Sequence, residues 1–302
     1  MSITMFFTKL ALKKPGAKIT HETFNVEAIR ENAKQSEQMK PVEGVRFEER
    51  VYDGVTVDVA IPEEKKTDNA IFYIHGGCMV SGDPRYSRSF TSYLAKEYGG
   101  NVYGVVYSLA PETKYPTQIE QCADAFCAIA KENPSAKITM LGESGGAYLI
   151  LATTVMLRKR GQRQPDALVP YSPLIDWSDA LDRSGYPDDL MVDYLSIQDM
   201  RENFCPEGQD YTDPDLSPLY ADFTGFPPIR VVWDKSECLT PDCEKLIEKA
   251  KSAGVYVEYK IWKGTFHVFE LVASILPEAR KEVKDTIAFI RNMTKYLMNL
   301  GE

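Results

Sequence analysis

The stretch KITMLGESGGAYLILATTVMLRKR (137–160) decides the fold of this chain. Its first residues form a short apolar run, which is typical of a strand buried on both faces. The last part favours a helix, and GESGG (142–146) lies between the two. Glycines on both sides of one serine predict a turn so sharp that side chains beside it would collide. Strand, glycine-flanked serine and helix together are the context of a nucleophile elbow.

The elbow makes Ser144 the candidate nucleophile. We expect its backbone to be strained and its Oγ to project above the carboxyl edge of the sheet. Gly142 and Gly146 lack a Cβ, so the strand and the helix can close around the serine. The positive end of the helix dipole then lies at the same place. The motif G-x-S-x-G alone is weak, because a chain of this length contains it by chance roughly one time in ten.

Strand and helix patterns alternate along the rest of the chain. Such alternation predicts an α/β fold with a mostly parallel twisted sheet and helices on both faces. VTVDVAI (55–61) alternates apolar and polar residues, which predicts a half-exposed strand. Further strands are expected at 70–77, 102–111, 167–175, 229–237 and 255–262, and further helices at 116–134, at 241–254 and from Pro277 onward.

Bulk composition excludes several classes of protein. The 302 residues carry a net charge of −9 and no dense Lys/Arg cluster, which argues against a nucleic-acid partner. Six scattered cysteines have no metal-ligand spacing, so we expect no metal and a cytoplasmic protein with reduced thiols. MSITMFFTKLALKK (1–14) has an apolar patch interrupted by Lys9, and it is a poor signal peptide and too short to span a membrane.

A second motif, His75-Gly76-Gly77-Cys78, directly follows a buried strand. Acyl transfer develops an oxyanion, which preorganised donors must stabilise. A glycine run lets backbone N–H groups point into one cavity. Alone, the motif is as well explained by a plain turn. Beside the elbow, it predicts an oxyanion hole made by the amides of Gly76, Gly77 and Gly145.

Only three histidines are available as a general base. His21 lies in a polar N-terminal segment and His75 in the glycine loop, which leaves His267, just after the last predicted strand. A carboxylate must orient this histidine and stabilise its charged form. In α/β-hydrolases the acid lies between the serine and the histidine in the chain. Here Asp234, Glu237 and Asp242 are the candidates: we favour Glu237 because it lies farther into the loop, with Asp234 as the alternative.

These residues resemble the hormone-sensitive-lipase-like group of α/β-hydrolase carboxylesterases. GESGG resembles G-D-S-A-G-G, HGGC resembles H-G-G-G, and YSLAPE (107–112) with Tyr115-Pro116 resembles Y-R-L-A-P-E…F-P. In the family the acid is usually an aspartate 30 residues before the histidine, and here Glu237 has that spacing from His267. Cys78 in place of glycine and glutamate in place of aspartate are departures from the family pattern.

The resemblance also implies a helical cap over the pocket. It divides the chain into an N-terminal cap segment (1–45) and a catalytic domain (46–302), with a cap insertion at about 177–224. The insertion is irregular and rich in Asp, Tyr and Pro, as lids and binding loops often are. Five residues are pocket candidates, although packing within the cap explains any one of the aromatic ones equally well: Cys78, Trp177, Tyr186, Tyr194 and Phe204.

The expected function is a serine carboxylesterase that hydrolyses small, short-chain acyl esters through an acyl-enzyme, with no cofactor. Its partner would be a small-molecule ester, and relatives in the family often dimerise, so a homodimer is one expected state. Two alternatives remain open at this point. One is a ligand-binding homologue that has lost turnover, because fold alone never secures function. The other is an amidase that uses the same triad.

Overall fold

The structure is a computed structural model that describes residues 2–13 and 18–299. Within these residues one eight-stranded sheet forms the centre, with the order β1-β2-β4-β3-β5-β6-β7-β8. The first two strands run antiparallel to their neighbours, and all other neighbouring pairs are parallel. The strands are β1 (Val45–Tyr52), β2 (Val55–Pro62), β3 (Ala70–Ile74), β4 (Val102–Val105), β5 (Ile138–Glu143), β6 (Ala167–Tyr171), β7 (Ile229–Asp234) and β8 (Val257–Trp262).

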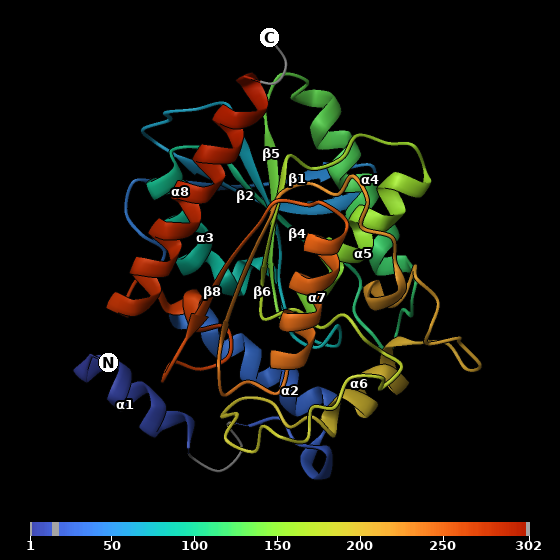
Figure 1. Cartoon of the computed structure of the whole chain (residues 1–302). Coiled ribbons are helices and arrows are strands. Elements are labelled where there is room, and N and C mark those ends of the chain that lie inside the picture. Colours follow the sequence, from blue (N-terminus) through green and yellow to red (C-terminus); the bar gives the residue numbers. More distant parts are fainter. Residues whose placement is uncertain (1, 14–17, 300–302) are drawn as a thin grey trace.

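Helices cover both faces of this sheet (Figure 1). The helices α3 and α8 lie on one side, and α4, α5 and α7 lie on the other. The predicted fold class is therefore confirmed. The helices are α1 (Ile3–Leu12), α2 (Val26–Lys34), α3 (Arg88–Tyr98), α4 (Thr117–Glu132), α5 (Gly145–Lys159), α6 (Ser196–Phe204), α7 (Thr240–Ser252) and α8 (Pro277–Asn299).

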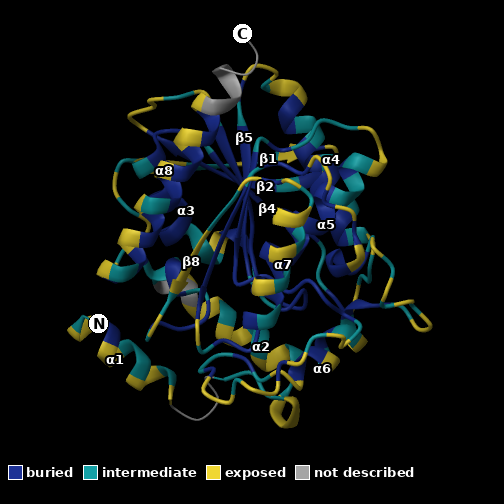
Figure 2. Ribbon diagram, in the orientation of Figure 1, coloured by how far each residue is buried: buried dark blue, intermediate teal, exposed yellow. Residues whose placement is uncertain are grey.

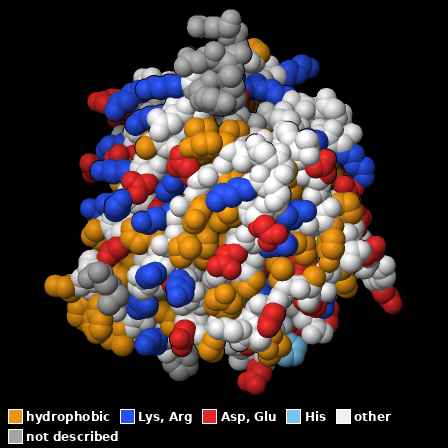
Figure 3. All heavy atoms as spheres, in the orientation of Figure 1, with side chains coloured by type: hydrophobic (Ala, Val, Ile, Leu, Met, Phe, Trp, Pro, Cys, Tyr) orange, Lys and Arg blue, Asp and Glu red, His pale blue; other side chains and the backbone are white. Residues whose placement is uncertain are grey.

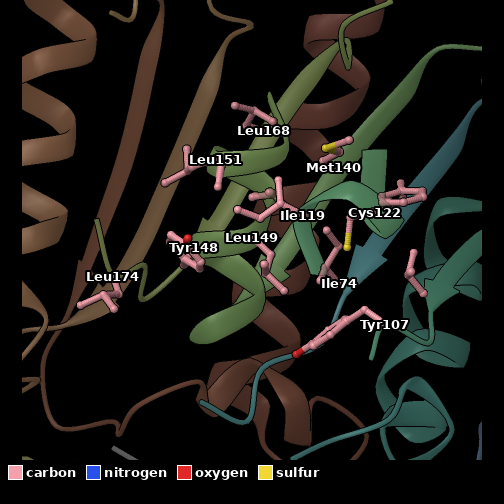
Figure 4. Packing of buried hydrophobic residues seen from close by; sticks show 14 of the residues in the cluster. Ile74, Tyr107, Ile119, Cys122, Met140, Tyr148, Leu149, Leu151, Leu168 and Leu174 are labelled. Carbon is pink, nitrogen blue, oxygen red and sulfur yellow. The ribbon is translucent and has the colours of Figure 1, made fainter. Parts of the chain in front are cut away.

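The central strands are continuous apolar runs because they feed two cores. Met140 of β5 belongs to the cluster with α4 and α5, whereas the next residue, Leu141, belongs to the cluster with α3 and α8. Successive side chains of a strand point to opposite faces, so a strand with helices on both sides has no polar face. Figure 4 shows part of the first cluster, with Met140 and Leu168 of the strands near Leu149 of α5. Figure 2 shows the same burial along the sheet.

The expectation of a half-exposed strand at 55–61 is wrong. Strand β2 is buried along nearly its whole length, including Asp58, which is only 3% exposed. Arg88 of α3 explains this burial, because its Nη2 lies 2.7 Å from Asp58 Oδ1. A buried carboxylate needs such a partner. The polar residue Asp58 in this alternating pattern therefore forms an ion pair with α3 and does not face water.

The N-terminal segment and the insertion at 177–224 meet over one end of the sheet. Ile19 pairs with Val192 in an isolated parallel bridge, and the backbone N–H of Ile19 donates to Met191 O at 2.9 Å. His21 Nδ1 also lies 2.8 Å from Asp199 Oδ2 of α6. Residue 45, where the predicted cap segment ends, is the first residue of β1. No helix within residues 2–13 and 18–299 is both long enough and apolar enough to cross a bilayer.

Candidate active site

The predicted sharp turn at Ser144 is confirmed. Ser144 has φ 53° and ψ −121°, a region that a non-glycine residue rarely adopts. A Cβ on Gly146 would lie 2.0 Å from Ile74 O, and one on Gly142 would lie 2.3 Å from Gly146 O. Neither backbone oxygen could yield to such contacts, so β5 and α5 can approach this closely only with glycine at both positions. The strained serine lies at the carboxyl edge of the parallel strands, where α/β proteins bind their ligands.

His267 lies in the loop after β8, and Glu237 lies in the loop after β7. His267 Nδ1 is 2.6 Å from Glu237 Oε2, and both side chains are buried. The other carboxylate oxygen, Oε1, accepts a hydrogen bond from the backbone N–H of Asp234 at 2.6 Å. Two donors thus hold the carboxylate, and the carboxylate orients the imidazole. His267 Nε2 is buried and has no hydrogen-bond partner among the described residues, and the residue His267 lines the same cavity as Ser144.

The two other carboxylate candidates hold loops together. Asp234 accepts hydrogen bonds from the N–H and hydroxyl groups of Thr265 at 2.7 Å, and from those of Ser236 at 2.9 and 2.7 Å. These contacts tie the acid loop to the histidine loop. Asp242, at the start of α7, pairs with the buried Arg183 at 2.7 Å. Of the three candidates, Glu237 is therefore the one in contact with His267.

Burial and charge act in opposite directions on His267. Burial opposes the charged imidazolium and lowers the pKa of His267, but the charge of Glu237 and its hydrogen bond outweigh burial. The pKa of His267 is therefore raised above its ordinary value of 6.5. Glu237 stabilises the protonated imidazole, which is the form that a general base reaches after it accepts a proton.

The loop after β3 has an unusual backbone. Gly77, Cys78 and Met79 all have positive φ angles of 108°, 58° and 60°. Consecutive residues with a left-handed backbone bring several N–H groups together. Two of them, Cys78 and Met79, carry a side chain, so their backbone conformation is strained. The backbone nitrogen of Cys78 lies 3.4 Å from the point where a Cβ on Gly145 would be. The backbone of this loop therefore lies against the start of α5.

Gly76 differs from the other residues of this loop. Burial has the largest effect on the pKa of the nearby Glu143 carboxyl and raises it, whereas the hydrogen bond from Tyr73, the charge of His267 and, least of all, the amide of Gly76 lower it. The pKa of Glu143 is raised to about 8, and Tyr73 donates a hydrogen bond to its Oε1 at 2.8 Å. The sequence predicts Gly76 as an oxyanion-hole residue, and Gly76 lines the same cavity as Ser144. The second oxygen of Glu143, Oε2, has no hydrogen-bond partner among the described residues.

Other side chains hold the loop from outside. The ring of His75 stacks on Tyr107 with 4.3 Å between ring centroids, and burial lowers the pKa of His75 to about 4. His75 is therefore neutral, and its Nδ1 lies 2.7 Å from Gly76 O. From α2, Arg30 donates through Nε to Val80 O at 2.8 Å. His75 shapes the loop, as expected from the sequence.

Arg30 also links the cap to the segment after β4. Its Nη2 donates to Ala110 O at 3.0 Å, and its two terminal nitrogens donate to Glu112 at 2.7 and 2.6 Å. A planar guanidinium can make these bonds together because it has three separate nitrogens, whereas the donors of a lysine all lie on one nitrogen. Sequence reasoning did not single out Arg30, because a charged residue in a short polar helix looks like a solvent-exposed one.

Two cavities meet at Ser144. The larger has a volume of about 180 Å³ and contains His267, the glycine loop and residues of the cap such as Ile19 and Met191. The smaller has a volume of about 20 Å³ and lies on the side of Gly145. Its remaining walls are sulfur-containing and aliphatic side chains: Cys78, Met79, Leu174, Val192, Ile197, Met200 and Leu239.

Of the five pocket candidates, only Cys78 lines these two cavities. Trp177 and Phe204 are fully buried in an aromatic cluster with Tyr148, where ring centroids lie 5.4 to 5.9 Å apart. Tyr186 lines a separate cavity, and Tyr194 is exposed. Aromatic residues in the insertion pack the cap, and aliphatic residues line the pocket.

Asp189 is a further residue that the sequence did not reveal. This buried side chain of the insertion accepts from the N–H of Cys238 at 2.9 Å, next to the acid Glu237. Its other oxygen accepts from the N–H groups of Met191 and Val192, which line the cavities. One carboxylate therefore connects the rim of the pocket with the loop that carries the acid. The described residues contain no group of three or more His, Cys, Asp or Glu side chains that could hold a metal ion.

With this geometry established, known proteins provide a comparison. A family described as alpha/beta hydrolase fold matches residues 71–271. The chain belongs to this family. It is 29% identical over 236 residues to an acetyl-hydrolase of Streptomyces hygroscopicus, covering 76% of this chain and 78% of the relative. An esterase of Acinetobacter venetianus is also 29% identical, over 262 residues that cover 85% of this chain and 82% of the relative.

A solved structure supports the same assignment. The crystal structure of an esterase from the bacterial hormone-sensitive lipase family matches with a TM-score of 0.90 and 28% identity, covering 97% of this chain and 99% of the other. The resemblance to hormone-sensitive-lipase-like esterases is thereby confirmed. The names of these α/β-hydrolases also agree with the class of ester hydrolase expected from the sequence.

Proposed function

We propose that this α/β-hydrolase is a serine carboxylesterase with Ser144 as nucleophile, His267 as general base and acid, and Glu237 as the orienting carboxylate. The observation that carries the proposal is the contact of 2.6 Å between His267 Nδ1 and Glu237 Oε2, with Nε2 left unpartnered among the described residues and with His267 and Ser144 lining one cavity. Hydrogen bonds between nucleophile and base often tighten only when substrate binds, so an unpartnered Nε2 is compatible with this role.

The reaction then has two steps. Ser144 Oγ attacks the ester carbonyl carbon while His267 accepts its proton, and the carbonyl oxygen becomes an oxyanion. The intermediate collapses, the C–O bond to the alcohol breaks, and the alcohol takes the proton from His267. Water then attacks the acyl-enzyme by the same route, releases the acid and restores Ser144.

For the oxyanion we propose the amides of Gly77, Cys78 and Gly145. The left-handed backbone of the first two and the approach of Cys78 N to Gly145 support this set. It adds Cys78 to Gly77 and Gly145, two of the amides expected from the sequence; the third expected amide, that of Gly76, belongs to the same cavity and stays the alternative donor. A side chain at position 78 does not remove its N–H, so cysteine can serve where relatives resembling H-G-G-G have glycine.

The two cavities bind different parts of the substrate. The leaving alcohol must lie near His267, which protonates it, so we assign it to the cavity of about 180 Å³ that contains this histidine. The acyl group then lies on the other side of the oxyanion hole, in the recess of about 20 Å³. A single water needs roughly 10 to 15 Å³ of such space. The recess thus accepts an acetyl group and resists longer chains, which supports a preference for short acyl esters.

The decisive experiment combines turnover with labelling of the nucleophile. The wild type should hydrolyse p-nitrophenyl acetate, and Ser144→Ala should reduce kcat by at least about 10³-fold. Ser252→Ala, at the exposed end of α7, is the matched control and should match the wild type. A phosphonylating p-nitrophenyl ester should add one adduct per chain, and peptide mass spectrometry should locate it on Ser144. Equal turnover by the wild type and Ser144→Ala would refute the assignment.

A further inference from the structure

Helix α1 has two apolar faces, and one of them faces solvent. Ile3, Phe6, Phe7 and Leu10 follow one another at spacings of three and four residues, so they lie along one side of the helix. Their exposed fractions are 79%, 53%, 62% and 56%. Figure 3 shows hydrophobic side chains gathered at the lower left of the molecule, over α1. We call these four residues the α1 stripe.

The opposite face of α1 is fixed to the body of the protein. Met5 is fully buried and belongs to the core cluster that includes α3 and α8. At the start of the helix, Ser2 donates through its backbone N–H and its hydroxyl to Glu278 at 2.5 and 2.8 Å. Near its end, Lys9 Nζ donates to Gly264 O at 3.2 Å. These contacts hold the helix on its inner side, and so they direct the α1 stripe outward.

The charge carried by the first 20 residues is opposite to that of the whole protein. Every charged residue among the first 20 is a lysine, at positions 9, 13, 14 and 18, whereas the chain has a net charge of −9. A basic amphipathic helix with exposed aromatic residues is typical of attachment to an anionic lipid surface. Acidic lipid attracts this lysine cluster, and it repels most of the rest of the molecule, so it selects this face.

A second copy of the chain is a poorer occupant of the α1 stripe. Four side chains bury a few hundred Å², whereas a stable interface needs about 800 Å² from each partner. Two copies that met through this face would also bring their lysine clusters together. Contact with a bilayer has neither cost, because the apolar side chains enter the acyl boundary and the lysines meet phosphate groups.

We propose that α1 attaches the protein to the surface of an anionic bilayer, with the α1 stripe inserted at the headgroup boundary and the neighbouring lysines on the lipid phosphates. This helix lies on a membrane and does not span it. The attachment is also close to the site that Ser144 defines. Leu12 at the end of α1 lines a cavity together with Leu190, and the next residue, Met191, lines the larger cavity together with Ser144. Binding at α1 would thus place a pocket wall near the lipid surface.

Vesicle flotation tests this proposal without any turnover. The purified full chain is mixed with vesicles of phosphatidylcholine and 30% phosphatidylglycerol, or of phosphatidylcholine alone. We expect binding to the anionic vesicles and at least about tenfold weaker binding to the neutral ones. The variant with all four stripe residues changed to serine should bind at least about 100-fold more weakly. A control variant changes three apolar residues of similar exposure on other surfaces and should bind like the wild type: Val51→Ser, Leu195→Ser and Ile275→Ser.

A variant with Lys13→Gln and Lys18→Gln tests the role of charge. Its binding to anionic vesicles should be about fivefold weaker per lysine, and its binding to neutral vesicles should change little. Phe7→Ser alone, with an expected loss of roughly tenfold, serves if circular dichroism finds the fourfold variant unfolded. Three results would overturn the proposal: no binding by the wild type, equal binding by the stripe and control variants, or light scattering that finds the wild type dimeric and the stripe variant monomeric. The last result would assign the stripe to a second copy.

Discussion

Replacing Glu237 by glutamine tests the proposed triad at the carboxylate that contacts His267. The carboxylate accepts two hydrogen bonds, one from the backbone N–H of Asp234 and one from His267 Nδ1, both at 2.6 Å. A glutamine amide has one acceptor oxygen and one NH₂ group. Since the backbone N–H of Asp234 cannot turn away, the glutamine oxygen should face it. The NH₂ group then meets Nδ1, which must become an acceptor.

That exchange places the imidazole proton on Nε2. An Nε2 that carries a proton cannot accept one from Ser144, so most of the variant is in the wrong tautomer. The charged hydrogen bond between Glu237 and His267 contributes about 1.5–3 kcal/mol, which the variant loses. The wrong tautomer lowers the stabilisation of the transition state further. Together they predict a fall in kcat of about 10³- to 10⁴-fold, equivalent to about 4 to 5.5 kcal/mol at 1.36 kcal/mol per factor of ten.

The pH profile of kcat/KM supplies a second, independent readout. The neutral imidazole is the active form, so activity rises with pH through the pKa of His267. Burial lowers this pKa, and Glu237 raises it by a larger amount. In Glu237→Gln the charge of Glu237 is gone, and burial is opposed only by the smaller effects of Asp189 and Glu143, so the acid limb of the profile should move to lower pH while the plateau falls. A change that merely distorted the loop would lower the plateau without this movement.

Matched variants separate chemistry from folding. Glu237→Asp keeps two acceptor oxygens but is one methylene shorter, so we expect a smaller loss of about 10- to 100-fold. Asp234→Asn should lower the thermal midpoint, because it replaces one of the two oxygens that accept from Ser236 and Thr265 by an NH₂ group, and it should keep activity within about tenfold. The assay is initial-rate hydrolysis of p-nitrophenyl acetate. Activity of Glu237→Gln within tenfold of the wild type, or a larger loss in Asp234→Asn, would refute the reasoning.

Three further changes test the surroundings of the site. Met200→Ala enlarges the acyl recess and should raise the ratio of hexanoate to acetate hydrolysis by about tenfold, whereas Leu271→Ala, in the alcohol cavity, should leave this ratio near its wild-type value. Arg30→Lys should lower kcat roughly tenfold with little change in KM, because a lysine cannot bind Val80 O, Ala110 O and Glu112 together; an unchanged kcat would contradict this. Burial raises the pKa of Glu143 from 4.5 to about 8, so the neutral acid favours the folded state and that stability is lost as pH rises through this window. Denaturant titrations from pH 5 to 9 should find that Glu143→Gln loses this dependence, and parallel curves for both proteins would contradict it.

The parts of the fold that the sequence predicted share one physical origin. Parallel strands covered on both faces are apolar throughout, and the turn at Ser144 needs glycine where a Cβ would meet backbone oxygens. Sequence patterns missed β1 and α3. β1 (VRFEERVY) is a charged antiparallel edge strand, and α3 (RSFTSYLAKEY) mixes polar and aromatic residues without a clean stripe. Neither has the periodicity that predicts its element.

The residues of the site also fall into those that the sequence could identify and those that it could not. Three residues could be selected from the sequence because each had its own constraint. The turn motif indicated Ser144, elimination of the other histidines left His267, and chain order favoured Glu237. Pocket residues had no such constraint, since spacing does not tell which way a side chain in an irregular segment points. Trp177 and Phe204 therefore looked like pocket walls but pack with Tyr148. Their place is taken by aliphatic residues, whose chemistry gives no signal in the sequence.

The cap does more than cover the site, because it supplies anchors for two separate parts of it. Arg30 of the N-terminal segment binds the backbone around the left-handed loop, and Asp189 of the insertion binds the N–H of Cys238 beside the acid. Both anchors bind backbone groups, so they are indifferent to which side chains line the cavities. Residues such as Met200 and Ile197 can then change with the substrate while the oxyanion loop and the acid keep their positions. Changes in the cavity lining should therefore leave the contact between His267 and Glu237 in place.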